Sequence, residues 1–381
     1  MQIVSEGWLV IPLSLAYLGL LFVIAYFTDQ NASARLRWQP AFYSFSIAVY
    51  CTSWTFYGTV GQASENFLSF IPIYLGPVLL FLFGWKLLAR VVLIAKREHI
   101  TTIADFIAAR YGKSQTLAVV ISLICIIGVL PYIALQLRAI VMGLDLFGGD
   151  AMREAVGKGS SSQIALFVSI ALAIFTMLFG TRHIDATEHH RGVIVAIAFE
   201  SLVKLVAFVC VGLLAVSILW DLPLSAQQAV SESFSFKWQE ISVADVTDLV
   251  IATLLAMSAV ICLPRQFHVT VVENNQVNDL KTARWLFPAY LVLLAIFVLP
   301  IAFAGDVLLP ANTPADNYVI SLPLAAGHDW LGMVAFLGGT SAASGMVVVS
   351  TIALAIMVSN DLVLPLLLKQ GGLSRRNFAQ F

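Results

Sequence analysis

The sequence predicts an all-α protein that crosses a membrane many times. Of its 381 residues, 60% are hydrophobic and only 11% are charged, whereas a soluble domain carries about 25% charged residues. The chain also contains nine apolar segments, each near the length of about 20 residues that a helix needs to cross a bilayer. Lipid offers no partner to an unpaired peptide group, so each segment must be helical. The net charge of −1 argues against a nucleic-acid partner.

The predicted spans follow one another with short connections. They cover residues 7–28, 41–61, 67–95, 116–144, 163–180, 192–220, 246–263, 285–305 and 331–358. The first follows Met1 directly and lacks a small-residue cleavage site, which is typical of a spanning helix rather than a removable signal. The four cysteines lie singly in apolar stretches, and we expect them to pack as small hydrophobic residues.

The basic residues predict the orientation, because inner loops of membrane proteins are rich in Lys and Arg. With the N-terminus outside, 16 of the 21 Lys and Arg residues fall in or next to inner loops, Arg265 among them, and three fall in outer loops. The sequence therefore predicts an outer N-terminus and an inner C-terminus.

Among the predicted loops, the inner segment HITTIADFIAARYG (99–112) contains a short amphipathic helix. Thr101 or Thr102 can cap its start, and its apolar stripe is expected to lie on the inner membrane surface. That stripe consists of Ile103, Phe106 and Ile107. The segments expected to form outer loops are 148–163, 224–240 and 304–330.

Two charges, Glu200 and Lys204, interrupt the apolar run AFESLVKLVAF (198–208). A lone charge in the middle of a spanning helix costs about 2.5–3.5 kcal/mol on insertion scales. At a spacing of four residues the two side chains can meet on one helix face, and we expect that face to look into the bundle. The pair is either a buried structural ion pair or a switch coupled to solute binding.

Another charge, Arg138, lies in the fourth predicted span, in LPYIALQLRAI (130–140). Gly128 and Pro131 predict a kink before it, because proline removes a backbone hydrogen bond and clashes with the preceding turn. The Arg138 side chain either extends to the outer interface or faces an anion at a solute cavity.

Small polar and aromatic residues crowd the second predicted span, in YCTSWTFYGTVGQA (50–63). Such a helix can unwind where it lines a cavity, and Gly58 is the expected break. Ser53, Trp54 and Tyr57 are candidate contacts for a solute. Ordinary aromatic packing and interface anchoring is the competing interpretation.

Pro264 predicts a break in the seventh span, directly before RQFH. The second and seventh spans are five apart, which is the offset that two five-helix inverted repeats require. The ninth span carries a run of small residues, Gly338 to Gly345, that permits either close helix packing or the approach of hydroxyl and carbonyl oxygens to a cation.

SWTFYG, ITTIADFIAARYG, LPRQFH and the stretch that ends in SNDL resemble the sodium:solute symporter family over essentially the whole chain. The resemblance is closest to a subgroup in which this module precedes a sensor histidine kinase, with AFESLVKLVAF and RQFHVTVVEN as its marks. It implies a LeuT-like five-plus-five inverted-repeat fold. The first span would be peripheral, spans 2–6 the first repeat, and spans 7–9 the start of a second repeat that this chain leaves unfinished.

The resemblance also implies site residues. Matching Trp54 and Gly58 to the family pattern W-x-x-x-G makes the backbone carbonyl groups of Ala48 and Cys51 sodium ligands. It puts Tyr50 where sodium-coupled members carry an important Asp.

On the ninth span, matching SNDL puts Gly345 and Met346 where those members have two hydroxyl residues, with Ser344 one position away. Because the chain departs from the pattern at both places, coupling to sodium and coupling to protons both stay open. Glu200 would be the proton-sensitive group.

The implied function is recognition, and transport, of a small organic solute such as an amino acid or short carboxylate, as sensory input to a two-component histidine kinase. Its partners would be the solute, the lipid bilayer of a bacterial inner (plasma) membrane and the downstream kinase domains. The sequence contains no catalytic constellation, and no cofactor is expected beyond a coupling ion. The alternatives are a stand-alone cation:solute symporter and a structural membrane anchor.

Overall fold

The computed structural model describes residues 10–30, 38–66, 68–156, 166, 169–174, 176–178, 191–224 and 242–369, which contain helices and no strand. The elements are α2 (Val10–Gln30), α3 (Gln39–Ile47), η2 (Ala48–Tyr50), η3 (Trp54–Gly58), α4 (Thr59–Glu65), α5 (Ile71–Leu82), α6 (Trp85–Arg97), α7 (Ile103–Arg110), α8 (Gln115–Val156), α10 (Arg191–Trp220), α12 (Val243–Cys262), α13 (Pro264–Phe267), η4 (His268–Val272), α14 (Asp279–Leu308), η5 (Ala315–Asn317), α15 (Tyr318–Ala325), α16 (Asp329–Met357), η6 (Val358–Val363) and α17 (Leu364–Lys369).

Six of the described helices are long and apolar enough to cross a membrane, and the pair α5 and α6, bent by 74°, is either a broken seventh span or a re-entrant loop. The six comprise α2, α8, α10, α12, α14 and α16 with its continuation into α17. The second predicted span divides into α3–η2 and η3–α4, so neither half reaches the required length. Of the fifth predicted span, the structure describes residues 166, 169–174 and 176–178, which are helical, and the rest lies outside the described residues. The chain is therefore an all-α membrane protein.

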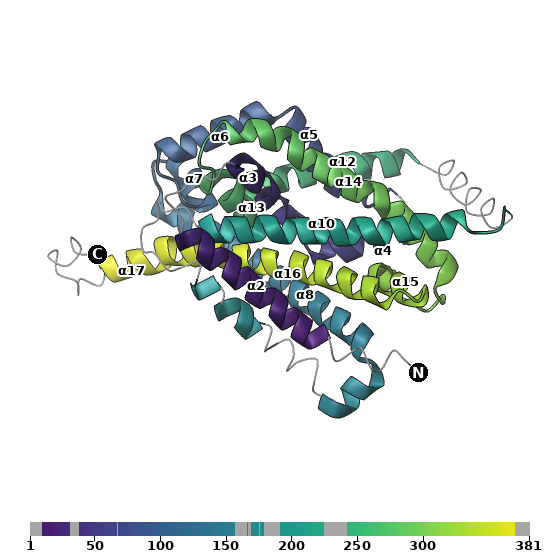
Figure 1. The fold of residues 1–381 in the computed structure, drawn as a ribbon. Coiled ribbons are helices and arrows are strands. Elements are labelled where there is room, and N and C mark those ends of the chain that lie inside the picture. The colour runs from purple at the N-terminus through teal and green to yellow at the C-terminus, as the bar shows by residue number, and fades with distance from the viewer. Residues whose placement is uncertain are drawn as a thin grey trace.

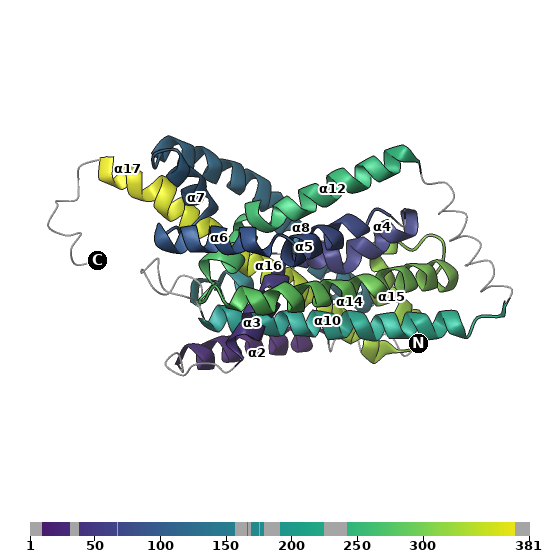
Figure 2. The same cartoon turned by 90° about the horizontal axis from the view of Figure 1, so that it is seen from above.

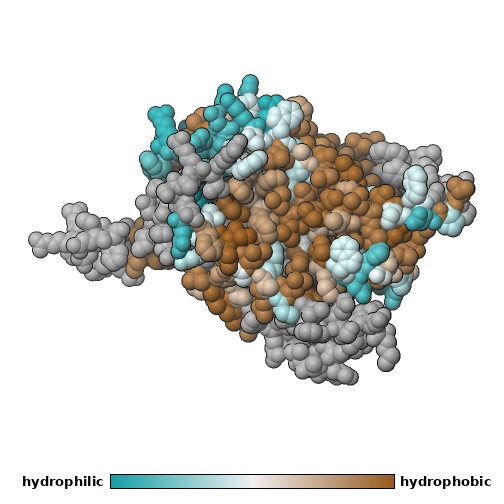
Figure 3. Space-filling model, viewed as in Figure 1, coloured by the Kyte–Doolittle hydropathy of each residue, from teal (hydrophilic) through white to brown (hydrophobic). Residues whose placement is uncertain are grey.

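The helix bundle has two distinct ends. Figures 1 and 2 show α6, α7 and α17 at the left end, and α4 and α15 toward the right. We call the left end the basic end, because α6 finishes in Lys96 and Arg97 and α7 finishes in Arg110. Hydrophilic surface gathers over this end in Figure 3, and hydrophobic surface covers the middle, as lipid contact requires.

Helix α10 runs through the bundle and packs against α2, α3, α14 and α16 (Figure 1). Small residues permit these approaches. A Cβ added to Gly192 would lie 2.5 Å from the Ala25 carbonyl oxygen, and one added to Gly338 would lie 2.5 Å from Ala207 Cβ. The span that carries both intramembrane charges is thus central.

Two boundaries and the packing of one helix differ from the prediction. Helix α8 continues to Val156, into a segment predicted as loop. The Pro-rich segment 304–330 contains η5 and α15, and α15 is helical because Val319, Ile320 and Leu322 are fully buried in the bundle. Helix α7 is capped by Thr102 as predicted, but its apolar stripe packs on the protein. The Phe106 ring lies 5.6 Å from that of Phe267.

Candidate solute site

The second span is broken at Cys51 and Thr52, between η2 and η3. Cys51 has φ −78° and ψ 100°, which is extended backbone. The chain then resumes as the π-helix η3, and π-helical turns often occur at functional sites. Gly58 is therefore not the break that the sequence predicted. It lies inside η3, where an added Cβ would come 3.1 Å from the Trp54 ring, so glycine serves close packing there.

Side chains from other spans hold the backbone groups that this break leaves free. Lys204 Nζ, from α10, donates to the carbonyl oxygens of Ala48 and Cys51, at 2.7 Å each. Gln136 Oε1, from α8, accepts from the Ser53 backbone N–H at 3.0 Å and from Ser53 Oγ at 2.7 Å. Unwound backbone inside a membrane protein persists only where such partners replace the missing helical bonds.

The seventh span is broken directly beside the second. Leu263 is extended, with ψ 128°, as the residue before a proline prefers, and Pro264 starts α13. Gln266 Nε2 reaches back to the Ile47 carbonyl oxygen at 3.1 Å. Tyr43 Oη donates to the carbonyl oxygen of Thr270, inside the π-helix η4, at 2.6 Å. Hydrogen bonds therefore link the broken segments of the second and seventh spans to each other.

Glu200 makes a different set of contacts from Lys204, although both side chains are buried, at 4% and 3% exposed. Ser344 Oγ donates to Glu200 Oε1, and Ser341 Oγ donates to the Glu200 carbonyl oxygen. A Cβ added to Gly345 would lie 2.6 Å from Glu200 Oε2. In the described part of the chain, no side-chain ion pair within 4.0 Å joins Glu200 to Lys204. The two charges thus act on each other through space without the direct ion pair that their spacing favours, and each has its own hydrogen-bond partners.

The residues implied as sodium ligands do not fit a sodium ion. The oxygens of Ala48 and Cys51 already accept from the Lys204 ammonium group. Gly345 and Met346, at the hydroxyl positions of the ninth span, carry no side-chain oxygen. A hard cation needs a shell of oxygen ligands, and here a lysine supplies the positive charge instead.

A cavity of about 720 Å³ opens beside η3, and we call it the Arg138 cavity. Its lining includes Ser53, Trp54, Tyr57, Arg138, Asp145 and Asp316. Asp316, in η5, also covers Gly61, since a Cβ added there would meet the carboxyl group. Burial, and then the charge of Glu65, raise the pKa of Asp316 above its ordinary value. The Arg138 side chain is exposed within this cavity.

A second cavity, of about 650 Å³, extends from α4 to the two breaks. We call it the Arg265 cavity. Its lining includes Tyr50, Trp54, Gln62, Tyr132, Pro264 and Arg265. Both volumes lie in the range of about 300–1,000 Å³ that is typical of small-molecule sites.

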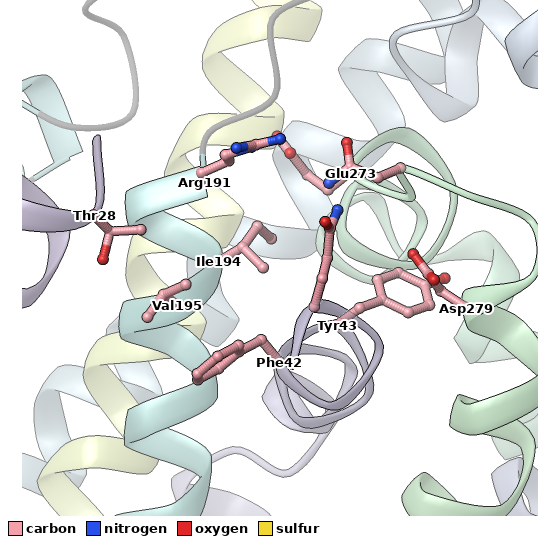
Figure 4. A pocket seen from close by; sticks show the side chains of 10 residues that line it. Thr28, Phe42, Tyr43, Arg191, Ile194, Val195, Glu273 and Asp279 are labelled. Carbon is pink, nitrogen blue, oxygen red and sulfur yellow. The ribbon is translucent and has the colours of Figure 1, made fainter. Parts of the chain in front are cut away.

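A much smaller pocket lies at the basic end. Figure 4 shows a pocket between Thr28 of α2, Tyr43 of α3, Arg191 of α10, and Glu273 and Asp279. Its volume is about 40 Å³, little more than a few water molecules occupy. The Arg138 cavity, which Asp316 and Asn317 of η5 help to line, lies toward the end opposite the basic one.

Family models were searched and none matches this chain, and no curated protein matches it.

The structure also places Tyr50, Tyr57 and Pro131, which the sequence analysis identified as candidate site or break residues. Tyr50 is buried and its ring packs edge-on against Phe287, with centroids 6.3 Å apart. Tyr57 is buried against Gly339, where an added Cβ would meet its hydroxyl group. Helix α8 continues through Pro131 without a break, since neighbouring groups in membrane bundles can compensate for a lost helical bond.

Arg265 is a candidate site residue that the sequence did not reveal. It was counted with the basic residues of an inner loop, but its side chain is 5% exposed and lines the cavity at the break. Pro264 could have indicated the buried position of Arg265. A residue that directly follows a break in a span lies inside the bundle rather than in a loop.

Proposed function

We propose that the chain is a transmembrane module that recognises and transports a small organic solute, an amino acid or a short carboxylate, and serves as sensory input to a histidine kinase. The observation that carries the proposal is that two interrupted spans meet at a largely apolar cavity whose lining includes three aromatic side chains and Arg265. Discontinuous helices at matching positions are the best pointer to a transporter binding site.

We further propose a LeuT-like inverted-repeat fold. The breaks lie five predicted spans apart, and each is followed by a π-helix, η3 in one case and η4 in the other. In the proposed orientation the basic end faces the cytoplasm of a bacterial-type cell and the N-terminus lies outside, because inner loops are rich in Lys and Arg.

Alternating access supplies the mechanism. The Arg138 cavity of about 720 Å³ toward the opposite end and the pocket of about 40 Å³ at the basic end support an outward-open state. A solute that binds this state more tightly than the inward-open one shifts the equilibrium by a factor of 10 for each difference of about 1.4 kcal/mol. A kinase can respond to that shift.

The stand-alone sodium:solute symporter is the weaker alternative, because Lys204 occupies the carbonyl oxygens that such an ion would need. A structural membrane anchor requires no cavity and no buried charge, and this chain has both.

A thermal-shift screen of the full-length protein against amino acids and short carboxylates tests the proposal. Binding stabilises the folded state by about 2.7 kcal/mol at a ligand concentration 100 times Kd. We expect at least one solute to raise the unfolding temperature, equally in sodium, potassium and choline chloride. Absence of any stabilising solute argues for the anchor, and a requirement for sodium argues for the stand-alone symporter.

A further inference from the structure

Arg265 lies where the two breaks meet, and its side chain is almost completely buried. It is the second residue of α13, directly after Pro264, and is 5% exposed. The guanidinium carbon lies 4.9 Å from the centroid of the Tyr132 ring, and the Nε atom has no hydrogen-bond partner among the described residues. The side chain therefore lines the cavity with part of its hydrogen-bonding capacity unused.

In the described part of the chain, no carboxylate lies within 4.0 Å of the Arg265 guanidinium group. Its polar neighbours are Tyr132, with which its side chain also makes a hydrogen bond, Tyr50 and Cys51. The charged neighbour is Lys204, which has the same sign of charge. Glu200, whose negative charge compensates that of Lys204, accepts a hydrogen bond from Ser344 Oγ. One positive charge at the junction is thus left without a counterion.

A buried cation of this kind is unfavourable in the empty protein. The desolvation penalty of a buried ion exceeds what one desolvated cation–π contact, such as that with Tyr132, returns. A guanidinium group binds a carboxylate through two parallel hydrogen bonds. An anionic group entering the cavity would therefore supply the missing charge and the missing acceptor together.

We propose that Arg265 is the receptor for the carboxylate group of the solute, with Tyr50, Trp54 and Tyr132 around the rest of the molecule. A singly charged carboxylate fits better than a dianionic phosphate, since only one cation is uncompensated. This inference rests on the proposed function and names the chemical group that the site selects.

The test compares carboxylates with their carboxamides on the full-length protein. Short monocarboxylates, α-amino acids and the amide of each are titrated against the wild type and the Arg265→Gln and Arg265→Lys variants. Arg284→Gln is the matched control, because Arg284 also stacks on aromatic rings, 5.2 Å from Trp85 and 5.0 Å from Trp285, but lines neither large cavity.

We expect the wild type and Arg284→Gln to bind a carboxylate about 100-fold more tightly than its amide, as loss of one partner of a buried charged pair implies. Arg265→Gln should lose this preference, and Arg265→Lys should keep part of it because the charge remains. Without solute, Arg265→Gln should unfold at a temperature no lower than the wild type, since an unpaired buried charge has been removed. If Arg265 served only to stabilise the fold, Arg265→Gln would unfold at a lower temperature than the wild type.

Two outcomes overturn the proposal in different ways. If a solute binds but its amide binds equally well, or if Arg265→Gln keeps the preference, the receptor is elsewhere and the transport function still stands. If neither acids nor amides bind the wild type, the receptor and the proposed function both fail. Should Arg265→Gln not fold, the wild-type preference and its reduction in Arg265→Lys still decide the question.

Discussion

Replacing Lys204 with methionine is expected to lower the free energy of unfolding by about 3–5 kcal/mol, the usual result of removing one partner from a buried charged cluster. The Ala48 and Cys51 carbonyl groups would lose their only charged donor, which bonds each at 2.7 Å. Insertion into the bilayer would become easier, because a lysine has left a spanning helix. The loss must therefore come from the folded bundle. Chemical unfolding of the protein in lipid nanodiscs measures it.

Two further variants sharpen this test. Lys281→Met, at an exposed position of α14, should change stability by no more than about 0.5 kcal/mol. Adding Glu200→Gln to Lys204→Met should recover part of the loss, because the buried carboxylate charge is then no longer uncompensated. A Lys204→Met protein as stable as the wild type would refute the role assigned to this lysine.

The second large effect is expected at Gly76, where α5 crosses α12. A Cβ there would lie 2.6 Å from the Met257 backbone nitrogen and 2.7 Å from the Thr253 carbonyl oxygen. Backbone atoms cannot rotate away, so Gly76→Leu must separate the two helices. We expect a destabilisation of about 3 kcal/mol and weaker solute binding, because both helices line the Arg265 cavity.

Gly19→Leu is the control for this substitution. An added Cβ at Gly19, in α2, meets nothing within 4 Å, so the same change should leave the unfolding transition and solute binding unaltered. If Gly76→Leu behaves like Gly19→Leu, the close approach of α5 and α12 is wrong.

Much of this arrangement follows from local sequence. Hydropathy predicts the all-α class and most of the spans, since each must bury its own peptide groups. Pro264 predicts the break in the seventh span, because a proline restricts the backbone of the residue directly before it, here Leu263. The inward direction of Glu200 and Lys204 follows from the cost of charge in lipid.

The parts that sequence could not predict depend on which helices become neighbours. The spacing of Glu200 and Lys204 favoured a pair on one helix, but Lys204 is closer to the free carbonyl groups of another span. The position of the break in the second span depends on Gln136 and Lys204, which bond to its backbone from α8 and α10. No property of residues 50–63 alone distinguishes Cys51 from Gly58.

The central claim is that a solute binds where the second and seventh spans break, and the native cysteines test it directly. Cys125 and Cys262 line the Arg265 cavity, whereas Cys210 lines neither large cavity. Alkylation of the full-length protein by a membrane-permeant maleimide, followed residue by residue with mass spectrometry, compares them. We predict that a bound solute slows labelling of Cys125 and Cys262 several-fold and leaves Cys210 unchanged. Saturating solute that leaves Cys125 and Cys262 as reactive as in the empty protein would contradict the claim.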